Sequence, residues 1–113
     1  MMATKKASRV HLMAAEGQAL GEAAMRGAGY DWDEAQILSR HVMDAALCGY
    51  EYSGLPKLLN IIDDPLFGAP RQPVSVIKDS GAAVLLDGGG NTGMIALHRA
   101  AETAIERSGL IDL

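Results

Sequence analysis

Three of the four prolines lie between residues 65 and 73, and this cluster limits the fold more than any other feature of the sequence. Proline lacks the amide hydrogen that helices and central strands need, and it favours an extended conformation in the residue before it. We therefore expect Pro65 to Pro73 to form an extended surface connection. With 113 residues in all, the chain has room for a single domain, spanning residues 1–113, with a modest core.

The first helix is predicted from about Ser8 to Arg26, where apolar residues recur with helical spacing. Gly17 and Gly21 lie four residues apart within it. Glycine costs about 1 kcal/mol relative to alanine in a helix interior. We therefore expect another helix to approach closely at these two positions.

Two further helices are predicted before the proline cluster. The second can be capped by Asp31 or Asp33, and Asp33 with Gln36 has the spacing of a capping box. A short third helix begins at Pro56 and stops at about Asp63. Apolar residues support both helices: Ile37, Leu38, Val42, Ala45 and Ala46 in the second, and Leu58, Leu59, Ile61 and Ile62 in the third.

The residues after the prolines predict a small β-hairpin and a fourth helix. Val74 and Val76 on one side and Ala82 to Leu86 on the other flank an Asp79-Ser80-Gly81 turn. The fourth helix is predicted from Met94 to Ser108, with Gly109 as its stop. Its predicted apolar face consists of Leu97, Ala101, Ala104 and Ile105. The fold class is therefore α+β, mainly helical, with about four helices and one hairpin.

Charge and composition exclude several functions. The net charge is −4, without the basic stripe that a nucleic-acid partner requires. The apolar stretch after the basic start is interrupted by His11, Glu16 and Gln18, so we expect no signal peptide, no membrane span and a cytoplasmic location. Cys48 is the single cysteine, which excludes an internal disulfide, and we expect it to be a small buried residue at a helix end.

The three histidines do not predict a metal site. His11, His41 and His98 fall on three different predicted helices, without the close helical spacing of a zinc-binding pair. His41 lies three residues before Asp44, which favours a local contact on one helix face. We expect His98 to lie at the surface or half-buried on its helix.

The segment from Gly49 to Lys57 follows the second predicted helix and sets polar side chains around a glycine turn. It resembles the Gly-x-x-Ser-His-Gly-x-x-Arg loop of the NAD(P)-dependent malate/L-lactate dehydrogenase family, the non-Rossmann 2-hydroxy-acid oxidoreductases. Gly49 and Gly54 match the two glycines, whereas Tyr52, Ser53 and Lys57 stand in place of the serine, the histidine and the arginine. The resemblance runs from about Val10 to Gly109, over the predicted helices, the hairpin and the Asp87-Gly88 turn.

The resemblance implies that the chain is the N-terminal portion of a dehydrogenase that uses NAD or NADP. The implied substrate is a small 2-hydroxy or 2-oxo acid, or a cyclic imino acid, and the implied assembly is a homodimer. Lys57 would orient the substrate carboxylate as a point charge. Tyr52 or Ser53 would lie beside the reacting carbon as the catalytic residue. Ser53 needs a neighbouring base for this task, whereas Tyr52 offers a phenol that a nearby cation such as Lys57 would make a better proton donor.

The turn from Asp87 to Gly93 is open to two interpretations. Gly88, Gly90 and Gly93 satisfy the bare Gly-x-Gly-x-x-Gly pattern between a strand and a helix, which favours a site for cofactor phosphates. The acidic residue expected about twenty positions later in that motif would have to be Asp112. The other interpretation is a tight strand-to-helix turn of the kind that the family shows here.

Two hypotheses of a non-catalytic function stay open. The last four residues resemble the start of another strand, so we expect a truncated domain, and such a chain would serve as a non-catalytic helical interaction or dimerisation module. The other reading is an independent four-helix binding domain, which requires that the hairpin be absent.

Overall fold

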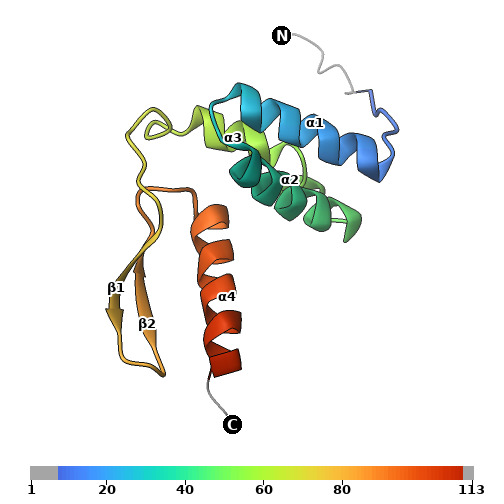
Figure 1. Cartoon of the computed structure of the whole chain (residues 1–113). Helices are drawn as coiled ribbons and strands as arrows, with labels where there is room; N and C mark the ends of the chain where they lie inside the picture. Colours follow the sequence, from blue (N-terminus) through green and yellow to red (C-terminus); the bar gives the residue numbers. More distant parts are fainter. Residues whose placement is uncertain (1–7, 111–113) are drawn as a thin grey trace.

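The computed structural model describes residues 8–110 (Figure 1). This part of the chain contains four α-helices, one 3-10 helix and a two-stranded antiparallel sheet. In chain order they are α1 (Ala14–Gly27), α2 (Trp32–Leu47), η1 (Glu51–Ser53), α3 (Lys57–Asp63), β1 (Ser75–Asp79), β2 (Val84–Asp87) and α4 (Gly93–Leu110). The predicted α+β class is confirmed. Because the hairpin is present, the hypothesis of an independent four-helix binding domain is wrong.

Helices α1, α2 and α3 form a helical lobe in which α1 lies directly against α2 (Figure 1). Gly17 and Gly21 are buried at this contact. Beside Gly21 lies Ser39, which is fully buried and donates its hydroxyl to the Gln18 carbonyl at 2.7 Å. A Cβ on Gly21 would collide with the Ser39 Oγ. The predicted close approach of a second helix at these glycines is therefore confirmed.

The core is small and lies mostly in the helical lobe. It is built from one methionine, one tyrosine and several aliphatic side chains, and α4 contributes a single fully packed residue to it. The buried hydrophobic residues are Met25, Tyr30, Ala35, Ile37, Leu38, Val42, Leu58 and Ile95. The first turn of α4 is therefore anchored in the helical lobe.

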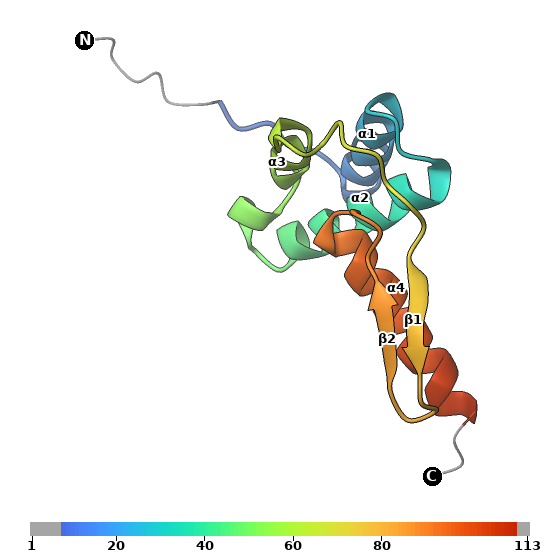
Figure 2. The same ribbon diagram turned by 90° about the vertical axis from the view of Figure 1, so that its left-hand side faces the viewer.

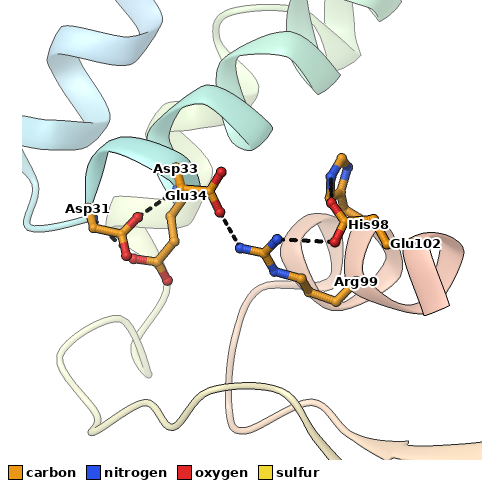
Figure 3. A network of polar contacts seen from close by, with 6 residues as sticks. All are labelled: Asp31, Asp33, Glu34, His98, Arg99 and Glu102. Carbon is orange, nitrogen blue, oxygen red and sulfur yellow. Dashed lines mark hydrogen bonds and ion pairs between the residues drawn. The ribbon is translucent and has the colours of Figure 1, made fainter. Parts of the chain in front are cut away.

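Helix α2 begins after Asp31, one of its two predicted caps, but its capping box differs from the predicted one. Asp31 is the N-cap: its carboxylate accepts a hydrogen bond from the Glu34 amide at 2.8 Å, and the Glu34 carboxylate accepts one from the Asp31 amide at 3.1 Å. The predicted capping box of Asp33 with Gln36 is wrong. Because α2 begins at Trp32, Asp33 already lies in its first turn, and its carboxylate pairs with Arg99 of α4 instead (Figure 3).

Two other predictions about the N-terminal half are wrong. Helix α1 begins at Ala14 rather than near Ser8, and Arg9 in the preceding irregular segment forms an ion pair with Glu51 of η1 at 2.7 Å. This pair links the segment before α1 to η1. Cys48 is exposed rather than buried, because it lies in the turn that caps the C-terminus of α2.

The predicted hairpin is present, although its second strand begins at Val84 rather than Ala82. Val76 pairs with Leu86 and Asp79 with Val84, and the register is irregular between Val76 and Lys78. The Asp79 carboxylate accepts a hydrogen bond from the Gly81 amide at 2.9 Å, which closes the turn. The hairpin lies beside α4 (Figure 2).

Helix α4 turns a different face inward from the predicted one. Ile95 is 2% exposed, whereas Leu97 and Ile105 of the predicted apolar face are 66% and 72% exposed. Arg99 pairs with Asp33 and also contacts Glu102, which in turn contacts His98 at 2.7 Å (Figure 3). The helix also passes through Gly109 to Leu110, so the predicted stop at Gly109 is wrong.

Leu110 belongs to α4, so the predicted strand-like ending is wrong at this residue. The rest of that ending, including the possible acidic partner Asp112, lies outside the described residues. The basic residues Lys5 and Lys6 lie outside them too. Among residues 8–110, no helix combines the length and the apolar character that a membrane crossing demands.

Candidate functional site

The loop from Gly49 to Lys57 keeps the backbone shape that its two glycines predict. Gly49 has a φ of 91°, a conformation that side-chain-bearing residues rarely adopt. Gly54 is buried, and a Cβ there would lie 3.2 Å from the Ala46 Cβ and 3.3 Å from the Glu51 carbonyl oxygen. Both glycines are therefore required by the way the loop folds back against α2.

Two of the three predicted site residues come together. The ammonium group of Lys57, the first residue of α3, lies over the ring of Tyr52 at 5.3 Å from its centroid. Tyr52 itself is 80% exposed on η1. Ser53 follows on the same short helix, is half-buried, and its amide donates to the Tyr50 carbonyl at 3.2 Å.

Lys57 also borders a cavity of about 430 Å³, which we call the Lys57 cavity. It lies between α3, the connection after it and the start of α4, and its volume is within the usual range for small-molecule sites. Tyr52 and Ser53 do not line it. The lining residues are Tyr30, Lys57, Asn60, Ile61, Asp64, Leu66, Phe67, Arg71, Gly90, Asn91, Thr92, Gly93 and Met94.

Arg71 is a charged residue of the cavity that was not among the predicted site residues. Its guanidinium lies over the Tyr30 ring at 4.2 Å from the centroid. Burial raises the pKa of the Tyr30 hydroxyl, the Arg71 charge opposes this rise and Glu34 adds to it. The sequence did carry one signal: Arg71 is the only charged residue between Asp64 and Lys78.

The turn from Asp87 to Gly93 is held by hydrogen bonds within the protein. The Gly89 amide donates to the Asp87 carboxylate, and the Gln72 amide donates to the Gly89 carbonyl, both at 2.8 Å. The Asn91 side chain donates to the carbonyls of Gln72 and Gly88, also at 2.8 Å. Gly89 has a φ of 66°, and a Cβ there would collide with the Gln72 carbonyl. Close approach of the proline-rich connection therefore accounts for this glycine.

Two other cavities contain titratable groups. One cavity, of about 710 Å³, lies between the hairpin and α4, and Glu34, Glu102 and Glu106 are among the residues that line it. Beside it, an ion pair between Arg107 and Asp79 joins α4 to the hairpin. The other, of about 450 Å³, is bordered by His41 and His98. Among residues 8–110, no group of three or more histidine, cysteine or acidic side chains is placed to hold a metal ion.

The chain is similar to one curated dehydrogenase. Over 89 residues it is 28% identical to hydroxycarboxylate dehydrogenase B of Escherichia coli O157:H7. The match covers 77% of the chain and 25% of that protein, so the chain spans about a quarter of the length of this relative. No family model matches the chain, and no solved structure matches it significantly. The likeness agrees with the resemblance of the Gly49 to Lys57 loop at the level of the hydroxy-acid dehydrogenases.

Proposed function

We propose that the chain belongs to a cytoplasmic NAD(P)-dependent oxidoreductase that acts on a small 2-hydroxy or 2-oxo acid, or on a cyclic imino acid. The observation that carries the proposal is the position of Lys57. It stands where the resemblance expects the carboxylate-binding arginine, and it borders a cavity of suitable size. The likeness to hydroxycarboxylate dehydrogenase B supports the same class of reaction.

Dehydrogenation of a 2-hydroxy acid requires a hydride acceptor, a group that takes the hydroxyl proton and a cation that holds the carboxylate. Lys57 fits the last of these tasks, because its ammonium group attracts a carboxylate without imposing bidentate geometry. Tyr52, whose ring lies beneath that ammonium group, is the nearer candidate for the proton. Ser53 is the second candidate and would need a base beside it.

The Asp87 to Gly93 turn does not fit the phosphates of a dinucleotide. The amides of Gly89 and Asn91 already donate to Asp87 and Gly88, and the Gln72 backbone fills the space beside Gly89. This turn is therefore not a candidate for binding the cofactor phosphates. NAD or NADP enters the proposal through the resemblance and through the class of the similar dehydrogenase.

The test is a fluorescence titration of the purified chain with NADH and with NADPH, followed by titration of the stronger complex with lactate. We expect saturable binding of one nucleotide, and binding of lactate that Lys57→Gln weakens while nucleotide binding stays unchanged. Arg26→Gln, which removes an exposed positive charge outside the three cavities, is the matched control. Absence of nucleotide binding by a folded chain would refute the proposal.

A second candidate function is a non-catalytic interaction or dimerisation module, and a specific observation favours it. Large apolar side chains of the hairpin and α4 are exposed, namely Val76, Ile77, Leu85, Leu97 and Ile105. The radius of gyration is 17.3 Å, whereas a compact domain of this length has about 13 Å. Light scattering tests this function: a homodimer is expected, and a stable, well-dispersed monomer would count against it.

A further inference from the structure

We propose that the Lys57 cavity holds a phosphate group, bound by Arg71, by the Tyr30 hydroxyl and by the free amides at the start of α4. The ligand class is a small phosphate monoester or the free phosphate ion. The inference goes beyond the proposed function, which assigns a role in this cavity to Lys57 alone.

The first amides of α4 have no partner within the described part of the chain. The helix runs for 18 residues from Gly93, and the amides of Thr92, Gly93 and Met94 donate to no group among residues 8–110. All three residues line the Lys57 cavity. Unpaired amides and the positive end of a helix dipole attract anions. A single phosphate needs only these amides, whereas the dinucleotide motif also needs the glycine turn before them, which is occupied by bonds within the protein.

The Tyr30 hydroxyl is an independent feature of the same cavity. Tyr30 is 4% exposed, yet none of the hydrogen bonds among residues 8–110 involves its hydroxyl. No fully enclosed side-chain nitrogen or oxygen in this part of the chain lacks a partner, so the hydroxyl reaches open space. Of the three cavities described above, Tyr30 lines this one alone. A mostly buried phenol therefore has a free O–H group to donate to a ligand in the cavity.

Arg71 supplies a positive charge in a fixed position. Its guanidinium lies over the Tyr30 ring at 4.2 Å from the centroid, and that ring lies against Phe67 with the centroids 6.2 Å apart. Stacking occupies the flat face of the guanidinium and leaves its N–H edge for a ligand. None of the ion pairs among residues 8–110 involves Arg71. Arg71 can therefore form charge-assisted hydrogen bonds to an anion without first breaking an ion pair.

The charge and size of the cavity favour phosphate over a single carboxylate. Lys57 and Arg71 line it together with one acid, Asp64, whose carboxylate accepts a hydrogen bond from the Leu66 amide at 2.8 Å. A phosphate monoester carries a charge of about −1.5 to −2 at neutral pH and has three acceptor oxygens. Its oxygens can be shared among the guanidinium, the phenol and the amides of α4. The volume of about 430 Å³ also leaves room for the organic part of a small ester.

The experiment is an NMR titration of the amide resonances with glycerol 3-phosphate and with inorganic phosphate, at low salt in a phosphate-free buffer. We expect saturable shifts of the Gly93 and Met94 amides with either ligand, and none with glycerol. Tighter binding of the ester would identify a phosphorylated small molecule as the ligand, and equal binding would identify the free ion. Both results support a phosphate site.

Variants separate the three groups of the site. Arg71→Gln and Tyr30→Phe should each weaken phosphate binding about tenfold, the lower end of the effect of a hydrogen bond to a charged group. Tyr30→Phe keeps the ring on which Arg71 stacks. Gly93→Pro removes one amide at the helix position that tolerates proline best, and it should also weaken binding about tenfold. Gly93→Ala is its matched control, because a Cβ there meets no atom within 4 Å and the amide stays.

Circular dichroism of each variant shows whether it is folded, and Arg26→Gln controls for the loss of one positive charge elsewhere. Absence of saturable shifts in the wild-type chain would overturn the inference. So would equal binding by the folded Arg71→Gln and Arg26→Gln variants, or by Gly93→Pro and Gly93→Ala. If Gly93→Pro does not fold, Arg71→Gln and Tyr30→Phe still decide the question. Shifts of the same size with sodium chloride at equal ionic strength would also refute a phosphate site, because they would show charge screening alone.

Discussion

The contact between α1 and α2 predicts that Gly21→Ala destabilises the protein. A Cβ on Gly21 would collide with the Ser39 Oγ and would lie 3.1 Å from the Ser39 Cβ and 3.3 Å from a Leu58 methyl group. Ser39 cannot rotate away freely, because it is fully buried and its hydroxyl donates to the Gln18 carbonyl. The added methyl group must therefore separate the two helices or break this hydrogen bond.

One stabilising and two destabilising effects set the magnitude. Replacing glycine by alanine inside a helix stabilises it by up to about 1 kcal/mol. Overpacking a tight contact costs about 1–3 kcal/mol, and loss of the Ser39 hydrogen bond costs about 1 kcal/mol more. We therefore expect a net loss of about 1–3 kcal/mol in the free energy of unfolding. For a domain of this size, that lowers the midpoint of thermal unfolding by about 4 °C or more.

Urea unfolding followed by circular dichroism measures this loss, and Gly27→Ala is the matched control on the same helix. No atom lies within 4 Å of the position that a Cβ on Gly27 would take. This control should be neutral or slightly stabilising. If Gly21→Ala proves as stable as Gly27→Ala, α1 and α2 do not approach each other as closely as the structure shows. A partial rescue of Gly21→Ala by Ser39→Ala would identify the serine as the colliding group.

Three other predictions concern polar groups at the surface. Asp33→Asn should lower the free energy of unfolding by about 0.5–1 kcal/mol at low salt and by less at high salt, because it removes the ion pair with Arg99; equal losses at both salt concentrations would contradict this. The hydrogen bond and charge of Arg9 lower the pKa of the Glu51 carboxyl. The ion pair of Arg9 with Glu51 is therefore complete above the ordinary glutamate pKa, and it is lost as the pH falls through the lowered pKa. An NMR titration should show Glu51 titrating at lower pH than in Arg9→Gln, and identical titrations would disprove the link. Cys48 should react fully with a thiol reagent in the folded protein, since it is exposed; reaction only after unfolding would show that it is buried.

The sequence was a good guide where local chemistry decides the structure. Glycine spacing predicted that another helix approaches α1 closely, and the Asp79-Ser80-Gly81 turn predicted the hairpin. Asp31 was one of the two predicted caps of α2, but the capping box was assigned to the wrong pair, because Asp31 with Glu34 and Asp33 with Gln36 have the same spacing. The first pair was identified only once the structure showed that α2 begins at Trp32 and that Asp33 contacts α4.

Apart from the approach of a helix at Gly17 and Gly21, the long-range contacts named here were beyond the sequence. Periodicity correctly found an apolar stripe along α4, but it cannot tell which face of a helix meets the core, and here Ile95 rather than Leu97 does so. The position of Arg71 depends on Tyr30, which is distant in the chain and joins it only through tertiary packing. The Lys57 cavity was missed for the same reason, since α3, the connection and the start of α4 meet only in the folded chain.

The walls of the Lys57 cavity belong to the well-packed part of the fold. One wall is formed by Tyr30 and α3, which belong to the packed helical lobe, and the opposite wall is the first turn of α4. Ile95 and the pair of Arg99 with Asp33 hold that turn against the lobe. The more distal part of α4 and the hairpin carry exposed apolar residues and contribute little to the core. A partner that covers this distal surface would therefore change the oligomeric state while leaving both walls of the cavity in place.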